Sequence, residues 1–341
     1  ENKTPWVGRA VVARPPQVGR KRVACTVLEH DGMPPSGPAY ACVASSDVTA
    51  ERMQYAIRLF CSSELAVGSE VFHDILGWEV APRPDRVVVP SVLTWHAPGL
   101  PQPNHSQRDA IASAIYRPRG VTVIQGPPGT GKTDTIAGLA YFLTRQQRGR
   151  ILFVAPSNSG ADNMSSRILK TGVKVIRVLA PNYRGVEALD EGTTLAWHAR
   201  RFVSHDDAMA LSRFEQIEAR FGELSKADLR RQQSIVASSE SAAIAAAQVV
   251  VVTCATAGEK RIMSHAFSTV IIDEATQATE PETLIPITRG CQQLIMVGDH
   301  KQLGPVVSDT MTAKAGLDLP LFTRMIPVSY THLRAHETGS Y

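Results

Sequence analysis

The residues of this chain with the clearest capacity for chemistry form a glycine-rich stretch, GPPGTGKT, from Gly126 to Thr133. The stretch matches the phosphate-binding pattern G-x-x-x-x-G-K-[ST] at every fixed position. Glycine lets the backbone approach phosphates without a Cβ in the way, and a helix start favours an anion. We predict that Lys132 reaches the β- and γ-phosphates and that the Thr133 hydroxyl binds Mg²⁺.

Two adjacent carboxylates follow another apolar run. Residues 270–272 read as a buried strand, and Asp273 and Glu274 come directly after it. In phosphate-loop enzymes the first carboxylate holds Mg²⁺, and the second is placed to polarise the attacking water as a general base. An acidic strand end is the alternative, but a complete phosphate loop upstream favours the catalytic interpretation.

Two glutamine side chains suit a nucleotide as well. Gln302 lies in a loop after an apolar run, and its amide can donate to a γ-phosphate oxygen and accept from water, so we predict a sensor of ATP against ADP. His300, in the same loop, is predicted to shape the loop rather than carry a proton. Gln107 precedes a helical pattern and could read an adenine edge. Alone, that segment would indicate a helix cap at Asn104 or Ser106.

Polar residues also begin the loops after two other predicted strands. They are Pro156, Ser157 and Asn158 after one strand, and Thr253 and Thr256 after the other. Hydroxyl and amide groups there can bond the phosphates of a threaded nucleic-acid strand. Ordinary helix capping explains the same residue types equally well, so the sequence leaves both interpretations open.

These residues need elements that bring them together, and from residue 104 onward strand-like and helical patterns alternate. Most strand-like runs are continuously apolar and β-branched, which is typical of a parallel sheet covered on both faces. The sequence therefore predicts an α/β fold with a doubly wound parallel sheet. The predicted strands are residues 121–124, 151–155, 173–178, 249–253, 269–272 and 294–297.

A helical insertion interrupts this alternation at about residues 185–248. Residues 200–221 and 225–248 are predicted to form two long helices, the second begun by Ser225 with Asp228 three residues on. Such a hairpin projects from an α/β domain and is a candidate contact surface. A solvated stalk without a partner is the alternative.

Residues 1–95 differ in composition and predict a partial, β-rich accessory domain. Strand-like runs cover 6–14 and 21–29, helical patterns lie near 49–61 and 70–76, and the prolines of 82–103 predict a linker. Residues 96–326 then form the predicted α/β domain.

The overall composition further limits the class of protein and the kind of partner. A net charge of +4 permits a nucleic-acid partner without requiring one, and 6% aromatic residues do not favour binding by base stacking. The five cysteines show no C-x-x-C spacing, which argues against a zinc site or a disulfide framework. No apolar run reaches membrane-spanning length. Because the first residue is Glu1, we interpret the chain as a fragment.

Together these motifs resemble those of superfamily 1 helicases, in particular the up-frameshift-type RNA helicases of nonsense-mediated mRNA decay. The resemblance covers about residues 5–325 and is most specific in the runs QATEPE and GDHKQLGPVV. It implies a RecA-like phosphate-loop lobe, a second such lobe with ATP between the two, and translocation in the 5′→3′ direction. It also implies that an accessory β-barrel and a helical stalk grip single-stranded RNA.

The resemblance implies a role for each matching residue, with ATP and Mg²⁺ as cofactors. Gln107 would contact adenine, and Gln302 would sense the γ-phosphate. Thr133 and Asp273 would bind the metal ion, and Glu274 would activate the attacking water. The implied phosphate contacts are Gly129, Thr130, Gly131, Lys132 and Thr133, and the implied RNA contacts are Pro156, Ser157, Asn158, Thr253 and Thr256.

The implied partners are single-stranded RNA and proteins of the decay pathway. We expect a monomer in the cytoplasm or the nucleus, with no membrane association. A superfamily 1 DNA helicase is the first alternative, and ATPase stimulation by RNA and by DNA separates the two. A nucleotide-binding module without unwinding activity is the second, and the salt dependence of RNA binding with and without Mg-ATP tests it.

The chain departs from the family pattern in two places. Ala275 stands where the family usually has serine, and we expect little effect. Residues 327–341 replace the start of a second lobe and resemble translated sequencing-adapter read-through, so we predict a non-native tail. Arginine fingers from a second lobe accelerate related reactions by about 10³–10⁵. We therefore expect the isolated chain to bind Mg-nucleotide, hydrolyse it slowly and not unwind RNA.

Overall fold

The computed structural model describes residues 8–12, 25–30, 48–62, 66–78, 95–116, 120–147, 149–180, 183, 191–326 and 330–332. The chain divides into two units, residues 1–47 and 48–341. In the first, β1 (Gly8–Val12) and β2 (Cys25–His30) pair antiparallel. Both strands lie in or overlap the runs predicted for the accessory domain, and the rest of that prediction before residue 48 lies outside the described residues.

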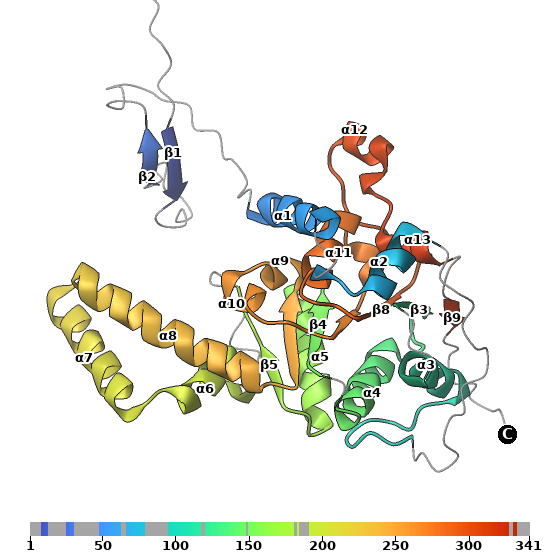
Figure 1. The fold of residues 1–341 in the computed structure, drawn as a ribbon, viewed down its shortest axis with the longest axis horizontal. Coiled ribbons are helices and arrows are strands. Elements are labelled where there is room, and N and C mark those ends of the chain that lie inside the picture. Colours follow the sequence, from blue (N-terminus) through green and yellow to red (C-terminus); the bar gives the residue numbers. More distant parts are fainter. Residues whose placement is uncertain are drawn as a thin grey trace, which may run out of the picture. The chain divides into compact units, whose positions relative to one another are not determined.

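The second unit is built on a seven-stranded sheet in the order β5-β6-β4-β7-β8-β3-β9 (Figure 1). Every neighbouring pair is parallel, which confirms the predicted fold class. β9 (Tyr330–His332) pairs with β3 and comes from the segment predicted to be a non-native tail. The six predicted strands are all present, as β3 (Val121–Gln125), β4 (Ile151–Ala155), β5 (Val175–Arg177), β6 (Val249–Thr253), β7 (Thr269–Ile272) and β8 (Gln293–Gly298).

Two hydrophobic cores lie on opposite faces of this sheet, because successive strand residues point to opposite sides. In β4, Phe153 belongs to one core and Leu152 and Val154 to the other. The first core is covered by α3 (His105–Tyr116), α4 (Lys132–Arg145) and α5 (Asn158–Lys170). The second is covered by α1 (Val48–Ser62), α2 (Ser69–Leu76), α11 (Glu280–Ile287) and α13 (Leu321–Met325).

The predicted helical hairpin is present, with a corrected start. The sequence predicts one helix over residues 200–221, but a 3₁₀ turn, η4 (Arg200–Phe202), ends first and α7 (His205–Phe221) begins anew. The break occurs because the Ser204 hydroxyl accepts a hydrogen bond from the Asp207 N–H and caps α7. Ser225 caps α8 (Lys226–Ala246) through the Asp228 N–H, as predicted.

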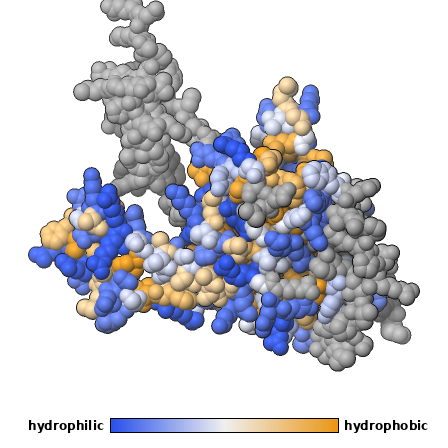
Figure 2. All heavy atoms as spheres, in the orientation of Figure 1, coloured by the Kyte–Doolittle hydropathy of each residue, from blue (hydrophilic) through white to orange (hydrophobic). Residues whose placement is uncertain are grey.

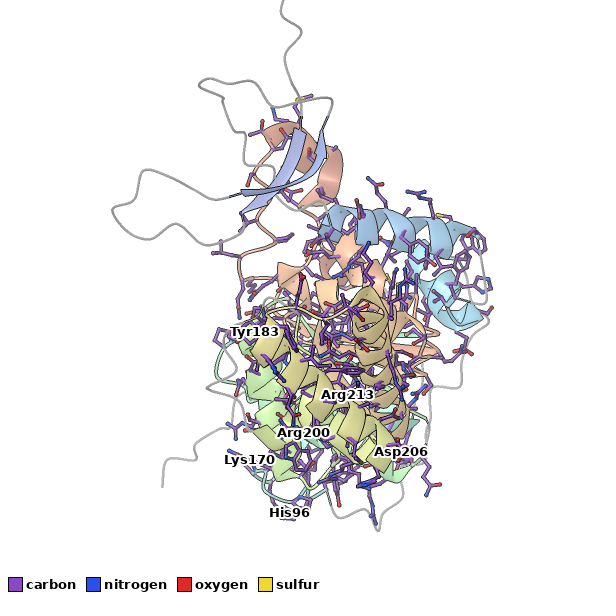
Figure 3. The ribbon with its side chains drawn as sticks, turned by 90° about the vertical axis from the view of Figure 1, so that its left-hand side faces the viewer. His96, Lys170, Tyr183, Arg200, Asp206 and Arg213 are labelled. Carbon is purple, nitrogen blue, oxygen red and sulfur yellow. The ribbon has the colours of Figure 1, made fainter. Side chains whose placement is uncertain are left out.

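The hairpin extends from the β5 side of the sheet, next to α6 (Leu195–Ala199) (Figure 1). Its surface is largely hydrophilic with apolar residues interspersed (Figure 2). Figure 3 views the molecule from the hairpin side and labels Arg200, Asp206 and Arg213 there. A mixed surface of this kind is compatible with both interpretations of the insertion, contact surface and solvated stalk.

Short elements complete the second unit. They are η3 (Glu191–Thr193), α9 (Cys254–Ala257), α10 (Lys260–Met263), η5 (Ala275–Gln277), α12 (Thr310–Thr312) and η6 (Ala313–Leu317).

Among the described residues, no helix is long and apolar enough to cross a lipid bilayer.

Candidate functional site

The phosphate loop joins β3 to α4 at the carboxyl edge of the sheet. Gly129 and Gly131 have φ values of +78° and +74°, a left-handed conformation that favours glycine. A Cβ on Gly126 would lie 2.7 Å from Lys132 Cγ, so this position has no room for a side chain. The Lys132 Nζ donates to the Gly126 carbonyl at 2.8 Å, which holds the ammonium group inside the curve of the loop. The backbone therefore forms a cradle of the kind that binds phosphate.

Asp273 and Glu274 follow β7, one strand beyond β8, and face this cradle. Glu274 Oε1 lies 3.9 Å from Lys132 Nζ, and the Glu274 N–H donates to Asp273 Oδ1 at 2.9 Å. Burial, together with the neighbouring Glu274 charge, raises the pKa of Asp273 to about 7. Glu274 Oε2 is buried and has no hydrogen-bond partner among the described residues. An orphaned carboxylate oxygen beside a raised-pKa carboxyl fits a site built for a cation or a water.

The loop after β8 adds a cluster of amides around a third carboxylate. Asp299 accepts from Gln125 Nε2 at 2.6 Å, and from Gln302 Nε2 at 3.4 Å. Burial opposes its ionisation, but the Lys301 N–H and these two amides hold the pKa of Asp299 below its ordinary value. The His300 ring Nδ1 lies 2.9 Å from Gln125 Oε1, so this histidine shapes the loop as predicted. Gln302 thus lies in the same loop as Asp299 and donates to it, while its contact with a γ-phosphate stays a prediction.

Gln107 is engaged within the protein at both ends of its amide. Its Nε2 donates to the Thr130 carbonyl at 2.8 Å, and its Oε1 accepts from the Asn104 N–H at 2.9 Å. Asn104 Oδ1 in turn accepts from the Gln107 N–H, so Asn104 caps α3. This arrangement ties α3 to the phosphate loop. The predicted adenine contact is not tested by it and stays a prediction.

A cavity opens beside the phosphate loop. One end is apolar, with Trp95, Leu100 and Pro101, and the other carries Gly129 and Thr130 of the loop. The Trp95 ring packs against Phe142 with their centroids 5.7 Å apart. An apolar slot next to a phosphate cradle has the layout that a nucleotide requires.

A second cavity joins the carboxylates to the loop after β4. Pro156 and Ser157 line it together with Asp273 and Glu274. The sequence did not show that these two groups share one cavity, because their neighbourhood depends on β4 lying next to β7. Two of the predicted catalytic residues, Asp273 and Glu274, and two of the predicted RNA-contact residues, Pro156 and Ser157, thus line one cavity.

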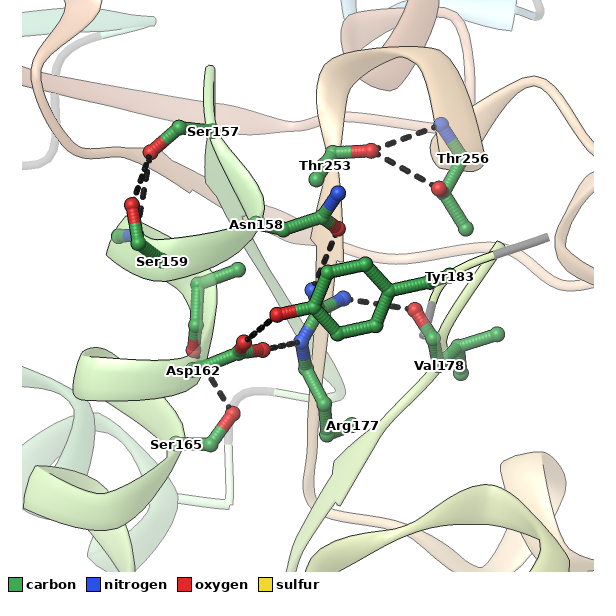
Figure 4. A network of polar contacts seen from close by, with 12 residues as sticks. Ser157, Asn158, Ser159, Asp162, Ser165, Arg177, Val178, Tyr183, Thr253 and Thr256 are labelled. Atoms are coloured by element: carbon green, nitrogen blue, oxygen red, sulfur yellow. Dashed lines mark hydrogen bonds and ion pairs between the residues drawn. The ribbon is translucent and has the colours of Figure 1, made fainter. Parts of the chain in front are cut away.

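Asn158 in this loop is held by a buried network (Figure 4). Arg177, with no exposed side-chain surface, donates to Asn158 Oδ1 at 2.9 Å and to Asp162 Oδ1 at 2.7 Å. The Tyr183 hydroxyl donates to the other Asp162 oxygen at 2.6 Å. With its oxygen occupied, Asn158 turns its amide nitrogen toward Thr253 in Figure 4, where it remains a donor.

The capping interpretation is confirmed for two of the polar loop starts. Ser157 accepts from the Gly160 N–H at 3.1 Å and Thr253 from the Thr256 N–H at 3.2 Å. Thr256 is 1% exposed, with its hydroxyl 2.8 Å from that of Thr253. RNA contacts by these residues and by Pro156 stay predictions.

The sequence did not single out Gln125, Asp299, Asp162 or Arg177. Asp299 stands in the GDHKQL run and could have been flagged as a carboxylate two residues after a predicted strand. Arg177 carried a weaker signal, a charged residue within an apolar strand, which requires a buried partner.

Comparisons with known proteins agree with this geometry. The AAA domain family matches residues 102–219 and 199–310. A regulator of nonsense transcripts 1 homolog from Neurospora crassa is 37% identical over 284 residues, covering 83% of this chain and 25% of that protein. The ATP-dependent helicase NAM7 of Saccharomyces cerevisiae is 35% identical over 332 residues, covering 96% of this chain and 33% of that protein.

The chain therefore spans about a quarter to a third of the length of these curated relatives. Among solved structures, bacteriophage T4 UvsW aligns with a TM-score of 0.35 and 16% identity, over 60% of this chain and 31% of that chain. The family match covers more than half of the chain, including the phosphate loop, Asp273, Glu274 and Gln302. The chain belongs to the AAA domain family, and its resemblance to the up-frameshift-type superfamily 1 helicases is confirmed.

Proposed function

We propose that this chain is the ATP-binding lobe of an ATP-dependent RNA helicase that moves 5′→3′ along single-stranded RNA. The observation that carries the proposal is the second cavity, which is lined both by Asp273 and Glu274 and by Pro156 and Ser157. A change at the hydrolysis site can reach the polar loop across one shared wall, and this is the coupling that a motor needs.

The nucleotide roles follow from the geometry of the cradle. Lys132 exchanges its bond to Gly126 for the β- and γ-phosphates, while the N–H groups of Gly129 to Thr133 surround them. Glu274, with one oxygen near Lys132 and the other unpaired, orients and deprotonates the attacking water. Gln302 senses whether a γ-phosphate is bound, from a loop in which its amide donates to Asp299.

Thr133 and Asp273 are the residues that would hold Mg²⁺. The raised pKa of Asp273 and the orphaned oxygen of Glu274 fit a nearby cation, because a cation favours the ionised form of both. When bound, the ion neutralises charge that develops on the phosphates.

RNA would run along the loops after β4 and β6. Asn158 donates its free amide hydrogens to the phosphate backbone, and Arg177 holds it in that orientation. Pro156, Ser157, Thr253 and Thr256 shape the same edge of the sheet. Such contacts read the backbone rather than the bases, as a translocating protein requires.

The relatives of this chain suggest a cellular process for the whole protein. They include regulators of nonsense transcripts, so we propose that the whole protein acts in nonsense-mediated mRNA decay. Proteins of that pathway would be its partners, in the cytoplasm or the nucleus.

The test is the Lys132→Ala variant in calorimetric titrations with Mg-ATP. We expect nucleotide binding to be lost because the cradle loses its cation. Lys170→Ala, an exposed residue at the end of α5, is the matched control and should bind as the wild type does. Unchanged affinity in Lys132→Ala would refute the nucleotide site. Stronger ATPase stimulation by single-stranded DNA than by RNA would favour the DNA helicase instead.

A further inference from the structure

The cavity beside the phosphate loop contains few polar side chains that are still available to a ligand. The hydroxyl protons of Thr130 and Thr135 are donated to the carbonyls of Pro127 and Gly131 at 2.8 and 2.9 Å. The Gln107 amide is engaged at both ends. Among the described residues that line this cavity, Asp134 is the one charged side chain.

Asp134 stands where the sugar of a nucleotide would lie. It follows Thr133 in the first turn of α4, so it adjoins the phosphate cradle. Gly138, one helical turn further on, lines the same cavity, and so does Phe142 next to Trp95 at the apolar end. A nucleotide with phosphates in the cradle and its base in the apolar slot must place its ribose between them, beside Asp134.

The Asp134 carboxylate forms an ion pair, without a hydrogen bond among the described residues, with a cation on the neighbouring helix. Its Oδ1 lies 3.3 Å from Arg167 NH1 of α5 and has almost no accessible surface. The side chain as a whole is 26% exposed, so its accessible surface lies on its other atoms. Arg167 thus offsets the repulsion between this carboxylate and a triphosphate, and the second carboxylate oxygen can still accept hydrogen bonds.

We propose that Asp134 accepts hydrogen bonds from the ribose hydroxyls of the bound nucleotide, so that the site selects ribonucleotides over deoxyribonucleotides. Carboxylates perform this task in dinucleotide-binding folds, where an acidic residue binds the ribose 2′-hydroxyl. The inference rests on the proposed function in one respect, that a nucleotide occupies the phosphate loop.

The experiment measures the affinities of the wild type and two variants for Mg²⁺ complexes of ATP, 2′-deoxyATP and 3′-deoxyATP by calorimetry. We expect the wild type to bind ATP about tenfold more tightly than at least one deoxynucleotide, because a hydrogen bond to a charged group is lost. Asp134→Asn and Asp134→Ala should reduce this preference to less than about threefold, mainly by weakening ATP binding. Asp109→Asn, an exposed carboxylate of α3, is the control and should keep the full preference.

Each outcome decides between distinct conclusions. Equal affinity of the wild type for all three nucleotides would overturn this inference and leave the proposed function intact. A full preference retained in both Asp134 variants would also overturn it. If the wild type bound none of the three nucleotides, both the proposed function and this inference would be overturned. Thermal melting of Asp134→Asn, which preserves the shape of the side chain, verifies that the variant is folded.

Discussion

Glu274 occupies a backbone conformation that few residues other than glycine adopt. Its φ and ψ are 49° and 41°, in the left-handed region. Such a conformation costs about 1–3 kcal/mol and persists where the surrounding structure enforces it, as at active sites. Here it directs the strand end so that the carboxylate of Glu274 approaches Lys132. The sequence predicted the carboxylate but not the strain, because Glu has no intrinsic preference for this region.

Asp273 gives a prediction about stability and pH in the metal-free protein. Burial raises its pKa to about 7 in the fold, whereas an unfolded chain has about 3.9. The folded state therefore holds a proton that the unfolded state has lost, and stability falls as pH rises from about 4 to about 7. Each pKa unit corresponds to about 1.4 kcal/mol. Asp273→Asn should melt at a higher temperature than the wild type at pH 8 in EDTA, with a smaller difference at pH 5.

A matched variant with the opposite sign is available in Asp299→Asn. Hydrogen bonds lower the pKa of this carboxyl, so its ionised form stabilises the fold at neutral pH. Asp299→Asn should therefore melt at a lower temperature than the wild type at pH 8. A lower melting temperature for Asp273→Asn as well would show that the ionised Asp273 stabilises the metal-free fold.

At the same scale, the sequence located the reactive residues better than their partners. The glycine pattern alone specifies Lys132 and Thr133, because the spacing is a property of one local loop. The Gln125–Asp299 hydrogen bond joins residues 174 positions apart. It exists because β3 and β8 are neighbours in the sheet. Strand order is not encoded in local patterns, so contacts of this kind could not be predicted.

At the scale of elements, the two helices of the hairpin are anchored unequally. Phe214 is the buried residue of α7, at 4% exposure, whereas α8 buries Ile235, Ser239, Ala243 and Ile244. The strands were predicted well because each is a continuous apolar run. The start of α7 was not, because a serine cap interrupts a pattern that is otherwise helical.

This imbalance predicts a local effect of Phe214→Ala. Truncation of a buried phenylalanine costs about 3–5 kcal/mol, and here the loss should fall on the hairpin. Amide hydrogen exchange should accelerate throughout α7 and leave the strands of the sheet protected. Phe221→Ala, on the same helix but 67% exposed, is the control and should change little. Unchanged exchange in Phe214→Ala would show that α7 does not depend on the Phe214 contact, and equal acceleration in both variants would show that burial of the ring does not set the effect.

At the scale of the whole molecule, the parallel sheet collects most of the candidate groups at one edge, and Gln107 of α3 joins them through its hydrogen bond to Thr130. β3, β7 and β8 deliver the nucleotide residues, and β4 and β6 deliver the polar loops. This division follows from the strand order. β4 and β6 lie on one side of β7, whereas β8 and β3 lie on its other side. The fold class could be predicted from the sequence, but the division of labour between the two halves of the sheet could not.

The position of Trp95 gives the molecule a built-in optical reporter. Of four tryptophans in the chain, Trp95 lines the cavity beside the phosphate loop, while Trp78 is 58% exposed and Trp197 stacks on Arg201. Indole emission depends on the polarity around the ring, so a nucleotide that enters the slot should change its intensity and wavelength. Titration with unlabelled ATP should give a saturable fluorescence signal that disappears in Trp95→Phe and survives in Trp197→Phe. A signal that persists in Trp95→Phe would place the base elsewhere. A signal that is lost in Trp95→Phe alone would allow nucleotide binding to be followed without any dye.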